Sequence, residues 1–267
     1  MTLDVLICTF NKGIVRIADV LGTPRKEVRY IVSYQYTEER YLELIPREVH
    51  EREDVEFHSF KGQGLSYNRN HALELATADW VCFADDDSRL SEDAYEKIAD
   101  TFAKYPLMDV AFFRASTYTG KLLKNYPKDE RVIDSFPKDY GISTIEMVFR
   151  REAVQGRLRF DERVGLGTPF LTCREEDFWL IDALRAGLNI RYFPYRIVET
   201  STMLKRSMLY VDAGVQRAEG AFTYYVYGAS AWWRCFWFAA NCTRKGLCHF
   251  IPMLRHLYEG IAFIRRK

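Results

Sequence analysis

The first hundred residues alternate between two hydrophobic patterns. Apolar runs of strand length cover residues 3–10, 28–34, 55–60 and 80–84. Each run is followed by a segment with apolar side chains at helical spacing, at residues 14–21, 38–45, 65–76 and 91–104. Strands that alternate with helices pair in parallel, so the pattern predicts an α/β fold with a mostly parallel, Rossmann-like sheet and flanking helices. Such sheets bind ligands beside the carboxyl ends of their strands.

The alternation loosens after residue 108. A further strand is predicted at 108–115, followed by a polar excursion over 116–142 and a strand at 143–149. A helix at 175–186 ends at Gly187, as is typical of a glycine just beyond a helix. Two short strands at 190–193 and 196–200 complete this part.

Residues 220–243 are apolar and aromatic, with Arg234 as their one charged side chain. The stretch has the roughly 20-residue length of a membrane span, but a central arginine would be costly there. Amphipathic helices lying on a membrane surface, with Trp and Tyr at headgroup level, are expected instead. An aromatic core helix is the alternative. We therefore predict a catalytic domain at 1–202 and a helical, membrane-associating region at 203–267.

Charge supports the same division. The chain carries a net charge of +1, which favours neither nucleic acid nor any other partner. Residues 234–267 carry a local charge of +6, which leaves −5 for the first 233 residues. A basic, aromatic tail predicts an anionic membrane surface as partner. Six cysteines without a C-x-x-C pair, and an N-terminus without a secretory pattern, favour a cytoplasmic location.

Three aspartates, Asp85, Asp86 and Asp87, directly follow the apolar run at 80–84. Adjacent carboxylates repel one another, so each resists ionisation unless a cation lies between them. The triplet is therefore either a solvated turn or a cation site. Its place at the end of a predicted strand favours the cation site, because Mg²⁺ and Mn²⁺ bind one or two carboxylates together with substrate phosphates.

A second acidic cluster, Glu-Glu-Asp at residues 175–177, opens a predicted helix. The helix dipole favours acidic residues in a first turn, so the cluster needs no catalytic role. It follows a Gly-x-Gly loop at 165–167, however, and is succeeded directly by the apolar Phe178. The dipole would lower the pKa of a carboxyl there, whereas burial and neighbouring carboxylates would raise it. The sequence leaves both directions open.

Together these motifs resemble those of the family 2 glycosyltransferases with the GT-A fold, especially bacterial enzymes that build surface polysaccharides. The matching segments, in order, are Cys8-Thr-Phe-Asn11, Gly64-Leu-Ser-Tyr-Asn-Arg-Asn70, Phe83-Ala-Asp-Asp-Asp87, Arg159-Phe-Asp-Glu162 with Gly165 and Gly167, and Glu176-Asp177. Their order and spacing, over about residues 3–200, are more specific than any single segment.

The resemblance implies roles for the matching residues in binding the donor. Thr9 and Phe10 match positions that hold the base and ribose of a nucleotide sugar. Arg69 and Asn70 match an Arg-Asn pair near the base and diphosphate. All four are therefore expected to bind the nucleotide.

The resemblance also implies the metal site and the base. Asp85 and Asp87 match an Asp-x-Asp motif that reaches the ribose and a metal-bound diphosphate, with Asp86 sharing the nucleotide role. Mg²⁺ or Mn²⁺ is the expected cofactor. Asp177, with Glu176 beside it, matches the catalytic base that deprotonates the acceptor hydroxyl in inverting enzymes.

The function implied is an inverting, metal-dependent transfer from a nucleotide sugar, UDP-linked on family grounds, to a glycan or lipid-linked glycan at the inner face of the cytoplasmic membrane. One departure concerns the metal. Many relatives have a histidine after the last sheet strand, where this chain reads Arg-Ile-Val-Glu-Thr-Ser-Thr at 196–202. Glu199, or Lys205 and Arg206 acting on phosphate, are the candidate replacements.

Two other functions remain open at this point. A nucleotidyltransferase would share the sheet and the acidic site, but it would usually carry a glycine-rich basic loop after the first strand, and residues 9–13 have only Gly13. A catalytically inactive membrane scaffold is disfavoured because Asp85, Asp87 and Asp177 are all present.

Overall fold

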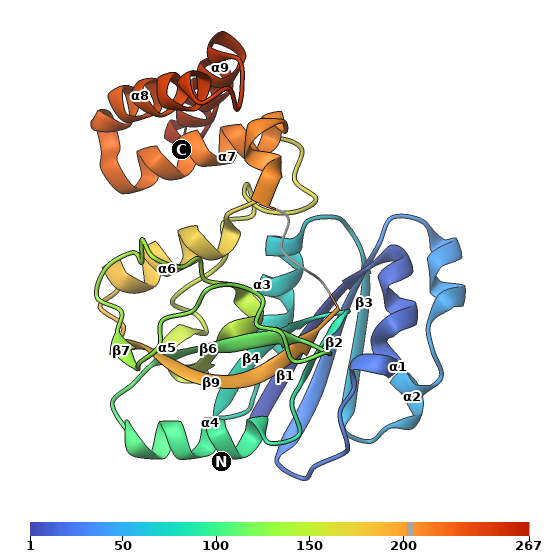
Figure 1. Ribbon diagram of the computed structural model, residues 1–267. Helices are drawn as coiled ribbons and strands as arrows, with labels where there is room; N and C mark the ends of the chain where they lie inside the picture. The colour runs from blue at the N-terminus through green and yellow to red at the C-terminus, as the bar shows by residue number, and fades with distance from the viewer. Residues whose placement is uncertain (202–205, 267) are drawn as a thin grey trace. The chain divides into compact units, whose positions relative to one another are not determined.

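The computed structural model describes residues 1–201 and 206–266 (Figure 1). The described chain divides into two compact units, each built from several segments. Unit 1 comprises residues 1–63, 67–159 and 182–201, and unit 2 comprises residues 64–66, 160–181 and 206–266. The domain boundary predicted at 202/203 falls outside the described residues.

Unit 1 contains a single sheet, in which nine strands are found among the described residues. The strands are β1 (Leu3–Phe10), β2 (Val28–Tyr36), β3 (Val55–Lys61), β4 (Trp80–Asp85), β5 (Ser88–Leu90), β6 (Val110–Thr117), β7 (Arg131–Val132), β8 (Met147–Arg150) and β9 (Ile190–Thr200). Their order is β3-β2-β1-β4-β8-β6-β9-β5, and β7 also pairs with β9.

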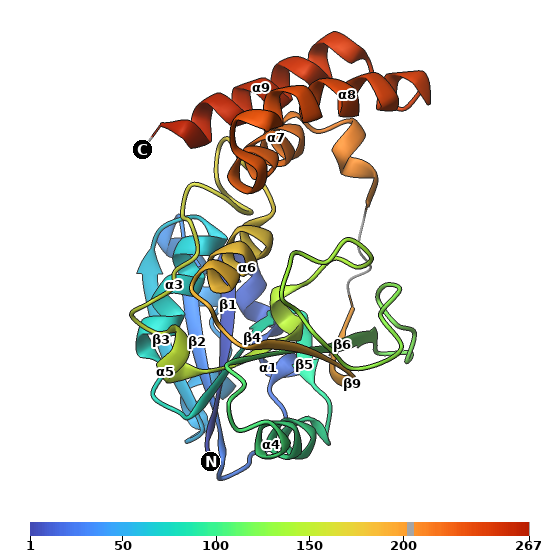
Figure 2. The same ribbon diagram turned by 90° about the vertical axis from the view of Figure 1, so that its left-hand side faces the viewer.

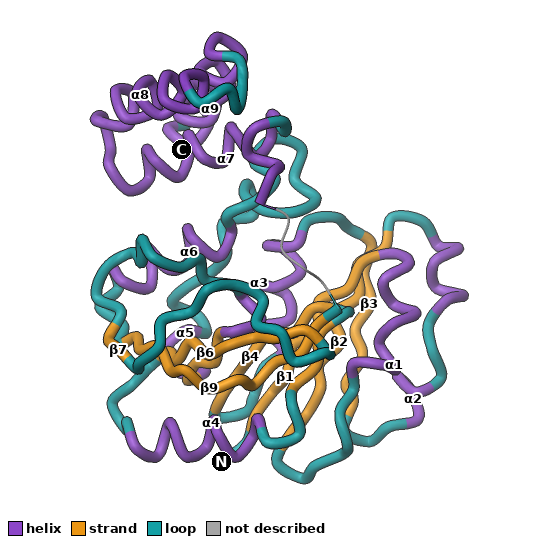
Figure 3. Tube along the Cα trace, viewed as in Figure 1, coloured by secondary structure: helices purple, strands orange, loops and turns teal. Residues whose placement is uncertain are grey.

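The sheet is mostly parallel, as predicted. Strands β3, β2, β1 and β4 are parallel neighbours, and β6 and β9 run in the same direction as these four. Strands β5, β7 and β8 run the opposite way. The reversal at β8 follows from its connection: residues 118–146 return as a largely irregular loop (Figure 3) rather than as the helical crossover that a parallel neighbour needs.

The α-helices are α1 (Ile17–Val20), α2 (Glu48–Glu51), α3 (Leu65–Leu75), α4 (Ala94–Lys104), α5 (Arg151–Val154), α6 (Glu175–Arg185), α7 (Ala213–Tyr227), α8 (Ala231–Arg244) and α9 (Phe250–Arg265). Short 3₁₀ turns join them, namely η1 (Asn11–Arg16), η2 (Glu39–Leu44), η3 (Thr144–Glu146), η4 (Arg206–Tyr210) and η5 (Gly228–Ser230).

Some predicted elements differ in detail. The helix expected at 14–21 is the end of the 3₁₀ turn η1 followed by the four-residue α1, and the one expected at 38–45 is the 3₁₀ turn η2. These short segments have little room for a longer α-helix. The two strands expected at 190–193 and 196–200 form the single strand β9. Pro194 explains the interruption seen in the sequence, since it lacks a backbone N–H, and the register with β6 shifts across it.

The core of unit 1 is layered. Leu3, Val5 and Ile7, on one face of β1, are buried with Ile17 of α1 and Ile98 of α4. Figure 2 shows α1 and α4 on this side of the strands and α3 and α5 on the other. Helices on both faces leave the strand ends as the open part of the sheet.

In unit 2, α7, α8 and α9 pack around their own apolar core. Its buried members lie on α8 and α9 at spacings of three or four residues: Ala231, Cys235, Ala239, Cys242, Met253, Leu257 and Ile261. Gly220 and Gly260 let α7 and α9 approach at backbone distance, because an added Cβ would lie 2.0 Å from the Leu257 carbonyl oxygen or 1.9 Å from that of Arg217. Over the described part of the chain, every helix is too short or too polar to cross a membrane.

Candidate functional site

The carboxyl ends of β1 and β4 lie side by side in unit 1. The two strands are parallel, and Cys8 is in register with Asp85. Thr9 and Phe10, which end β1, therefore share one edge of the sheet with the aspartates that follow β4. The structure places the predicted donor-binding residues of these two strands at the same edge.

Asp86 is held by partners within the protein. Its carboxylate accepts a hydrogen bond of 2.8 Å from the Thr9 hydroxyl and forms an ion pair with Arg16 of η1. Gly13 leaves room for this arrangement, since a Cβ there would lie 1.9 Å from Asp86 Oδ2. The middle aspartate thus joins the loop after β1 to the loop after β4.

Asp85 faces a cation from α3. Its Oδ1 lies 3.7 Å from Nη2 of Arg69, and the Arg69 side chain is only 6% exposed whereas that of Asp85 is 45% exposed. The predicted neighbour Asn70 is buried, and the ring of Phe10 is 40% exposed at the strand end. A buried arginine that reaches an accessible carboxylate supplies positive charge at this edge.

Asp87 lies beside the end of β9. Its carboxylate accepts hydrogen bonds from the hydroxyls of Thr200 (3.4 Å) and Ser201 (3.1 Å), and its carbonyl oxygen accepts one from the Tyr118 hydroxyl (3.1 Å). The segment in which relatives carry a histidine therefore contacts Asp87, although it offers hydroxyl groups instead of an imidazole.

The three candidate replacements for that histidine differ. The carboxylate of Glu199 lies 3.2 Å from the guanidinium of Arg89. Lys205 lies outside the described residues, as does the side chain of Arg206.

The donor set fits a divalent cation that takes part of its coordination from substrate. Within the described part of the chain, no group of three or more His, Cys, Asp or Glu side chains could hold a metal ion by itself. Asp85 and Asp87 are partly accessible carboxylates two residues apart at the sheet edge. Mg²⁺ is commonly held by one or two carboxylates together with substrate phosphates, and these two residues match that mode.

Glu176 and Asp177 lie in the first turn of α6, within unit 2. The backbone N–H groups of Asp177 and Phe178 donate to the carbonyl of Arg174, which fixes this turn. The Phe178 ring packs against Phe222 and Tyr225 of α7, with centroids 5.6 and 4.7 Å away. The apolar contacts after the acidic cluster hold the carboxylate in place.

Asp177 is an unusually basic carboxylate. Burial raises its pKa, the ion pair with Arg174 (Nη1 to Oδ2, 2.6 Å) lowers it, and the negative charges of Glu219 and Glu175 raise it again. The result is a pKa of about 6, against an ordinary 3.8. Burial thus outweighs the arginine, which decides the question that the sequence left open.

The loop at 165–167 takes the conformation that its glycines suggest. Gly165 and Gly167 have φ of +118° and +85°, values that favour glycine. The loop is tied to the start of α3, because the Leu65 N–H donates to the Leu166 carbonyl at 2.9 Å and the Ser66 hydroxyl donates to the Val164 carbonyl. A Cβ on Gly165 would lie 3.2 Å from Glu175, so the glycine also makes room for α6.

Sequence reasoning missed four contacts in these two clusters. Arg16, Thr200 and Ser201 bind the aspartates of unit 1, and Glu219 binds Arg174 in unit 2. Arg16 follows the first strand by only a few residues. A basic side chain in that loop could have been predicted to contact the aspartates at the same edge of the sheet. The other three contacts join residues far apart in the chain, and no local pattern marks them.

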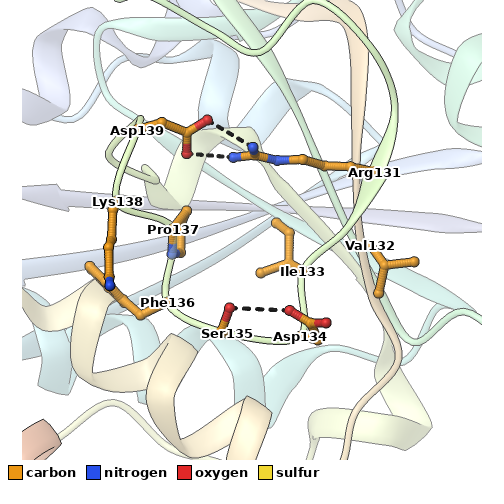
Figure 4. Close-up of a pocket in the computed structure, with 9 residues that line it drawn as sticks. All are labelled: Arg131, Val132, Ile133, Asp134, Ser135, Phe136, Pro137, Lys138 and Asp139. Atoms are coloured by element: carbon orange, nitrogen blue, oxygen red, sulfur yellow. Dashed lines mark hydrogen bonds and ion pairs between the residues drawn. The ribbon is translucent and has the colours of Figure 1, made fainter.

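The polar excursion encloses a separate hollow of about 400 Å³ (Figure 4). Residues 131–139 line it, and two of them, Arg131 and Asp139, form a two-fold ion pair at 2.6 and 2.7 Å. None of the predicted donor-binding residues lines this hollow. It therefore contributes nothing to the candidate site.

Comparison with known proteins identifies a matching family. The model of the family described as "Glycosyl transferase family 2" matches residues 4–161. A comparison with curated proteins gives no match.

Solved structures of S. aureus TarS are similar in fold. Residues 1–349 of TarS align with a TM-score of 0.55 at 15% identity, covering 84% of this chain and 66% of that one. The complex of the same fragment with UDP gives 0.57 at 15% identity over the same shares. Its complex with UDP-GlcNAc gives 0.54 at 14% identity, covering 84% and 67%. The chain thus spans about two thirds of this TarS fragment, and the likeness supports the GT-A-like fold.

Proposed function

Because the chain belongs to glycosyl transferase family 2, whose model matches more than half of it, we propose that it moves a sugar from a nucleoside-diphosphate donor to a hydroxyl of a surface glycan. Because the chain belongs to a glycosyltransferase family, the nucleotidyltransferase alternative is set aside. UDP is the proposed nucleotide, since TarS structures contain UDP and UDP-GlcNAc. The observation that carries the proposal is the shared edge of β1 and β4, with Thr9, Arg69 and the aspartates.

The donor half of the reaction belongs to unit 1. The exposed ring of Phe10 offers a face for the base, and the carboxylate of Asp85 can accept hydrogen bonds from ribose hydroxyls. Arg69 offers positive charge to the diphosphate. Asp86 keeps the two loops together, because its own charge is already paired with Arg16.

Asp87 and Asp85 would hold the divalent cation. Mg²⁺ or Mn²⁺ at these carboxylates would supply positive charge against the negative charge that develops on the departing nucleotide.

The residue proposed to act on the acceptor, Asp177, lies in unit 2. A carboxylate with a pKa of about 6 is ionised at neutral pH and is more basic than an ordinary aspartate. Asp177 accepts the proton of the acceptor hydroxyl while the hydroxyl oxygen bonds to the anomeric carbon. The bond from that carbon to the diphosphate oxygen breaks in the same displacement, so the anomeric configuration inverts.

The base assignment is tested with Asp177→Asn in the full chain. Nucleotide release from UDP-GlcNAc and other UDP-sugars is measured with Mn²⁺, with and without a bacterial lipid extract as acceptor. General-base catalysis contributes about 100- to 10,000-fold, so the rate should fall by that factor. Thermal stabilisation by donor and Mn²⁺ should persist, because the proposed donor-binding residues lie in unit 1.

Asp182→Asn is the matched control, since Asp182 lies on the same helix, past the first turn. It should retain the wild-type rate. A wild-type rate in Asp177→Asn, with the fold intact, would show that the base lies elsewhere. If no nucleotide sugar stabilises or reacts with the wild-type chain, the inactive-scaffold alternative gains support.

We also propose that residues 203–267 associate with an anionic membrane, as the site of a lipid-linked acceptor on the inner face of the cytoplasmic membrane. Trp233 and Trp237 lie one helical turn apart on α8 and are 69% and 67% exposed. Ile251 of α9 is also largely exposed. Exposed tryptophans beside a basic stretch suit the headgroup region of a bilayer.

Sedimentation with vesicles of phosphatidylglycerol and phosphatidylcholine tests this proposal. Trp233→Ser combined with Trp237→Ser should reduce binding at least about 10-fold, since each buried indole contributes on the order of 1–2 kcal/mol. Leu107→Ser, which removes an exposed apolar side chain of unit 1, should bind as the wild type does. Equal binding by all three proteins would overturn the membrane proposal.

A further inference from the structure

Arg174 lies between two carboxylates that come from different helices of unit 2. One guanidinium nitrogen, Nη1, pairs with Asp177 of α6 at 2.6 Å, and the other, Nη2, pairs with Glu219 of α7. The side chains are 26%, 14% and 17% exposed for Arg174, Asp177 and Glu219, so solvent screens the three charges only in part. The guanidinium also lies 4.7 Å from the centroid of the Phe222 ring.

The backbone of Arg174 is unusual as well. Its φ is +76°, in the left-handed region where glycine or asparagine is the usual residue. Holding another residue there costs about 1–3 kcal/mol. The carbonyl of Arg174 accepts the N–H groups of Asp177 and Phe178 in the first turn of α6, which the carbonyl of any residue in this conformation could do. What only an arginine supplies is the two-pronged cation between Asp177 and Glu219.

We propose that Glu219 is a positioning residue for the transfer reaction: it draws Arg174 away from exclusive pairing with Asp177, and thereby keeps Asp177 able to accept the proton of the acceptor. This rests on the proposed role of Asp177 as base. It assigns a function in the chemistry to α7, a helix of the C-terminal region whose described contacts otherwise serve packing.

The charges around Asp177 give the direction of the effect. The charged groups that shift its pKa are Arg174, which precedes α6, Glu175 of α6 and Glu219 of α7. Arg174 favours the ionised form of Asp177 and therefore lowers its pKa, whereas Glu219 and Glu175 raise it. Loss of Glu219 removes one repulsive charge and leaves Arg174 with a single partner. Both changes weaken Asp177 as a base.

The test compares Glu219→Gln with Arg174→Gln in the full chain. The protonation of Asp177 is followed directly, as the pH midpoint of its carboxyl ¹³C signal in protein labelled at aspartate, with the signal assigned by its loss in Asp177→Asn. Glu219→Gln should lower the midpoint by about one pH unit, and Arg174→Gln should raise it by about as much. The acid limb of the pH–rate profile for nucleotide release should move in the same two directions.

Glu259→Gln is the matched control. It removes a comparable ion pair of α7, between Glu259 and Arg217 at 2.7 Å, which does not act on Asp177. In Glu259→Gln, the pH midpoint of the Asp177 carboxyl signal should equal that of the wild type. If Arg174→Gln does not fold, Arg174→Lys takes its place. Because it keeps the charge, its midpoint should stay near that of the wild type.

A midpoint that does not move in Glu219→Gln, or that rises, would overturn the inference. Failure of the proposed function has a different signature. If the midpoints move as expected while Asp177→Asn releases nucleotide at the wild-type rate, then the ion-pair network exists but Asp177 is not the base, and the positioning role falls with it.

Discussion

The three adjacent aspartates illustrate how position decides the role of a residue. Asp86 is neutralised by Arg16 and fixed by Thr9, Asp85 faces Arg69, and Asp87 is bound by hydroxyl groups at the end of β9. The same residue type thus has a salt-bridged, an accessible and a hydroxyl-bound form within three positions.

The pH dependence of the reaction should report Asp177. A base acts only when ionised, so the rate should fall as pH drops below its pKa, and burial has raised that pKa to about 6. We expect kcat/KM to lose about half of its plateau value near pH 6, whereas an ordinary aspartate would keep it until about pH 4. Initial rates of nucleotide release between pH 4.5 and 8 would check this, with thermal melts confirming that the protein stays folded. A flat profile down to pH 4.5 would contradict the assignment.

For single residues, the sequence indicated which side chains lie together at the sheet edge, but it did not indicate the residues that contact them. Thr9 and the aspartates could be placed together because apolar runs mark the strands and parallel strands end at one edge. The contacts of Thr200 with Asp87, and of Glu219 with Arg174, could not be predicted. They depend on packing between segments far apart in the chain, for which one sequence carries no local signal.

Among the elements, α7 and α9 show most clearly what glycine can do inside helices. Glycine normally weakens a helix by about 1 kcal/mol relative to alanine. Gly220 and Gly260 nonetheless lie within α7 and α9, where an added methyl group would meet the backbone of the other helix. The close approach of the two helices therefore requires them.

Gly220→Ala should destabilise unit 2 despite the better helix propensity of alanine. The Cβ would meet the Leu257 carbonyl oxygen at 2.0 Å, so α7 and α9 must separate, and overpacking of this kind costs about 1–3 kcal/mol. We expect the melting temperature to fall by about 2–4 °C for each kcal/mol, as measured by differential scanning calorimetry. Gly141→Ala, where a Cβ would meet nothing within 4 Å, should melt like the wild type. A stabilised Gly220→Ala protein would argue against the close helix contact.

Helices and strands with a clear local sequence pattern were predicted correctly, and those without one were missed. The amphipathic helix α4 and the capped helix α6 lie within a few residues of their expected ranges. Strand β5, with the sequence Ser-Arg-Leu, has no apolar run and was missed. The antiparallel insertion of β8 between β4 and β6 was also missed, because strand order is decided by non-local pairing.

For the whole molecule, unit 2 is built from segments that lie far apart in the chain. Charge and aromatic content predict a boundary at 202/203, and that division remains a prediction. Unit 2, however, includes residues 160–181 together with α7, α8 and α9. Phe178, directly after Asp177, is buried against rings of α7. The helix that carries Asp177, the proposed base, is therefore packed against the C-terminal helices.

A chain that ends at residue 201 should consequently lose more than membrane binding. Without α7, Phe178 loses its aromatic partners and Arg174 loses Glu219. We expect stabilisation by UDP and Mn²⁺ in a thermal-shift measurement to persist, and nucleotide release to fall at least about 100-fold. The double tryptophan variant, which leaves these contacts intact, should release nucleotide normally in the absence of vesicles. A truncated chain with full activity would show that unit 2 is not needed for the chemistry.

Because unit 2 is built from segments far apart in the chain, it can fold completely only after the last of them has been synthesised. A ribosome releases the chain from its N-terminus at about 5–20 residues per second, so residues 160–181 wait several seconds for α7, α8 and α9. During that interval Phe178 has no partner from α7 to cover it, and a chaperone would find an apolar helix face to bind. The nascent chain can complete the sheet of unit 1, with its proposed donor-binding residues, before the helix with the proposed base Asp177 is packed against α7. Transfer activity would thus begin only when the last helices, which also carry the exposed tryptophans, have left the ribosome.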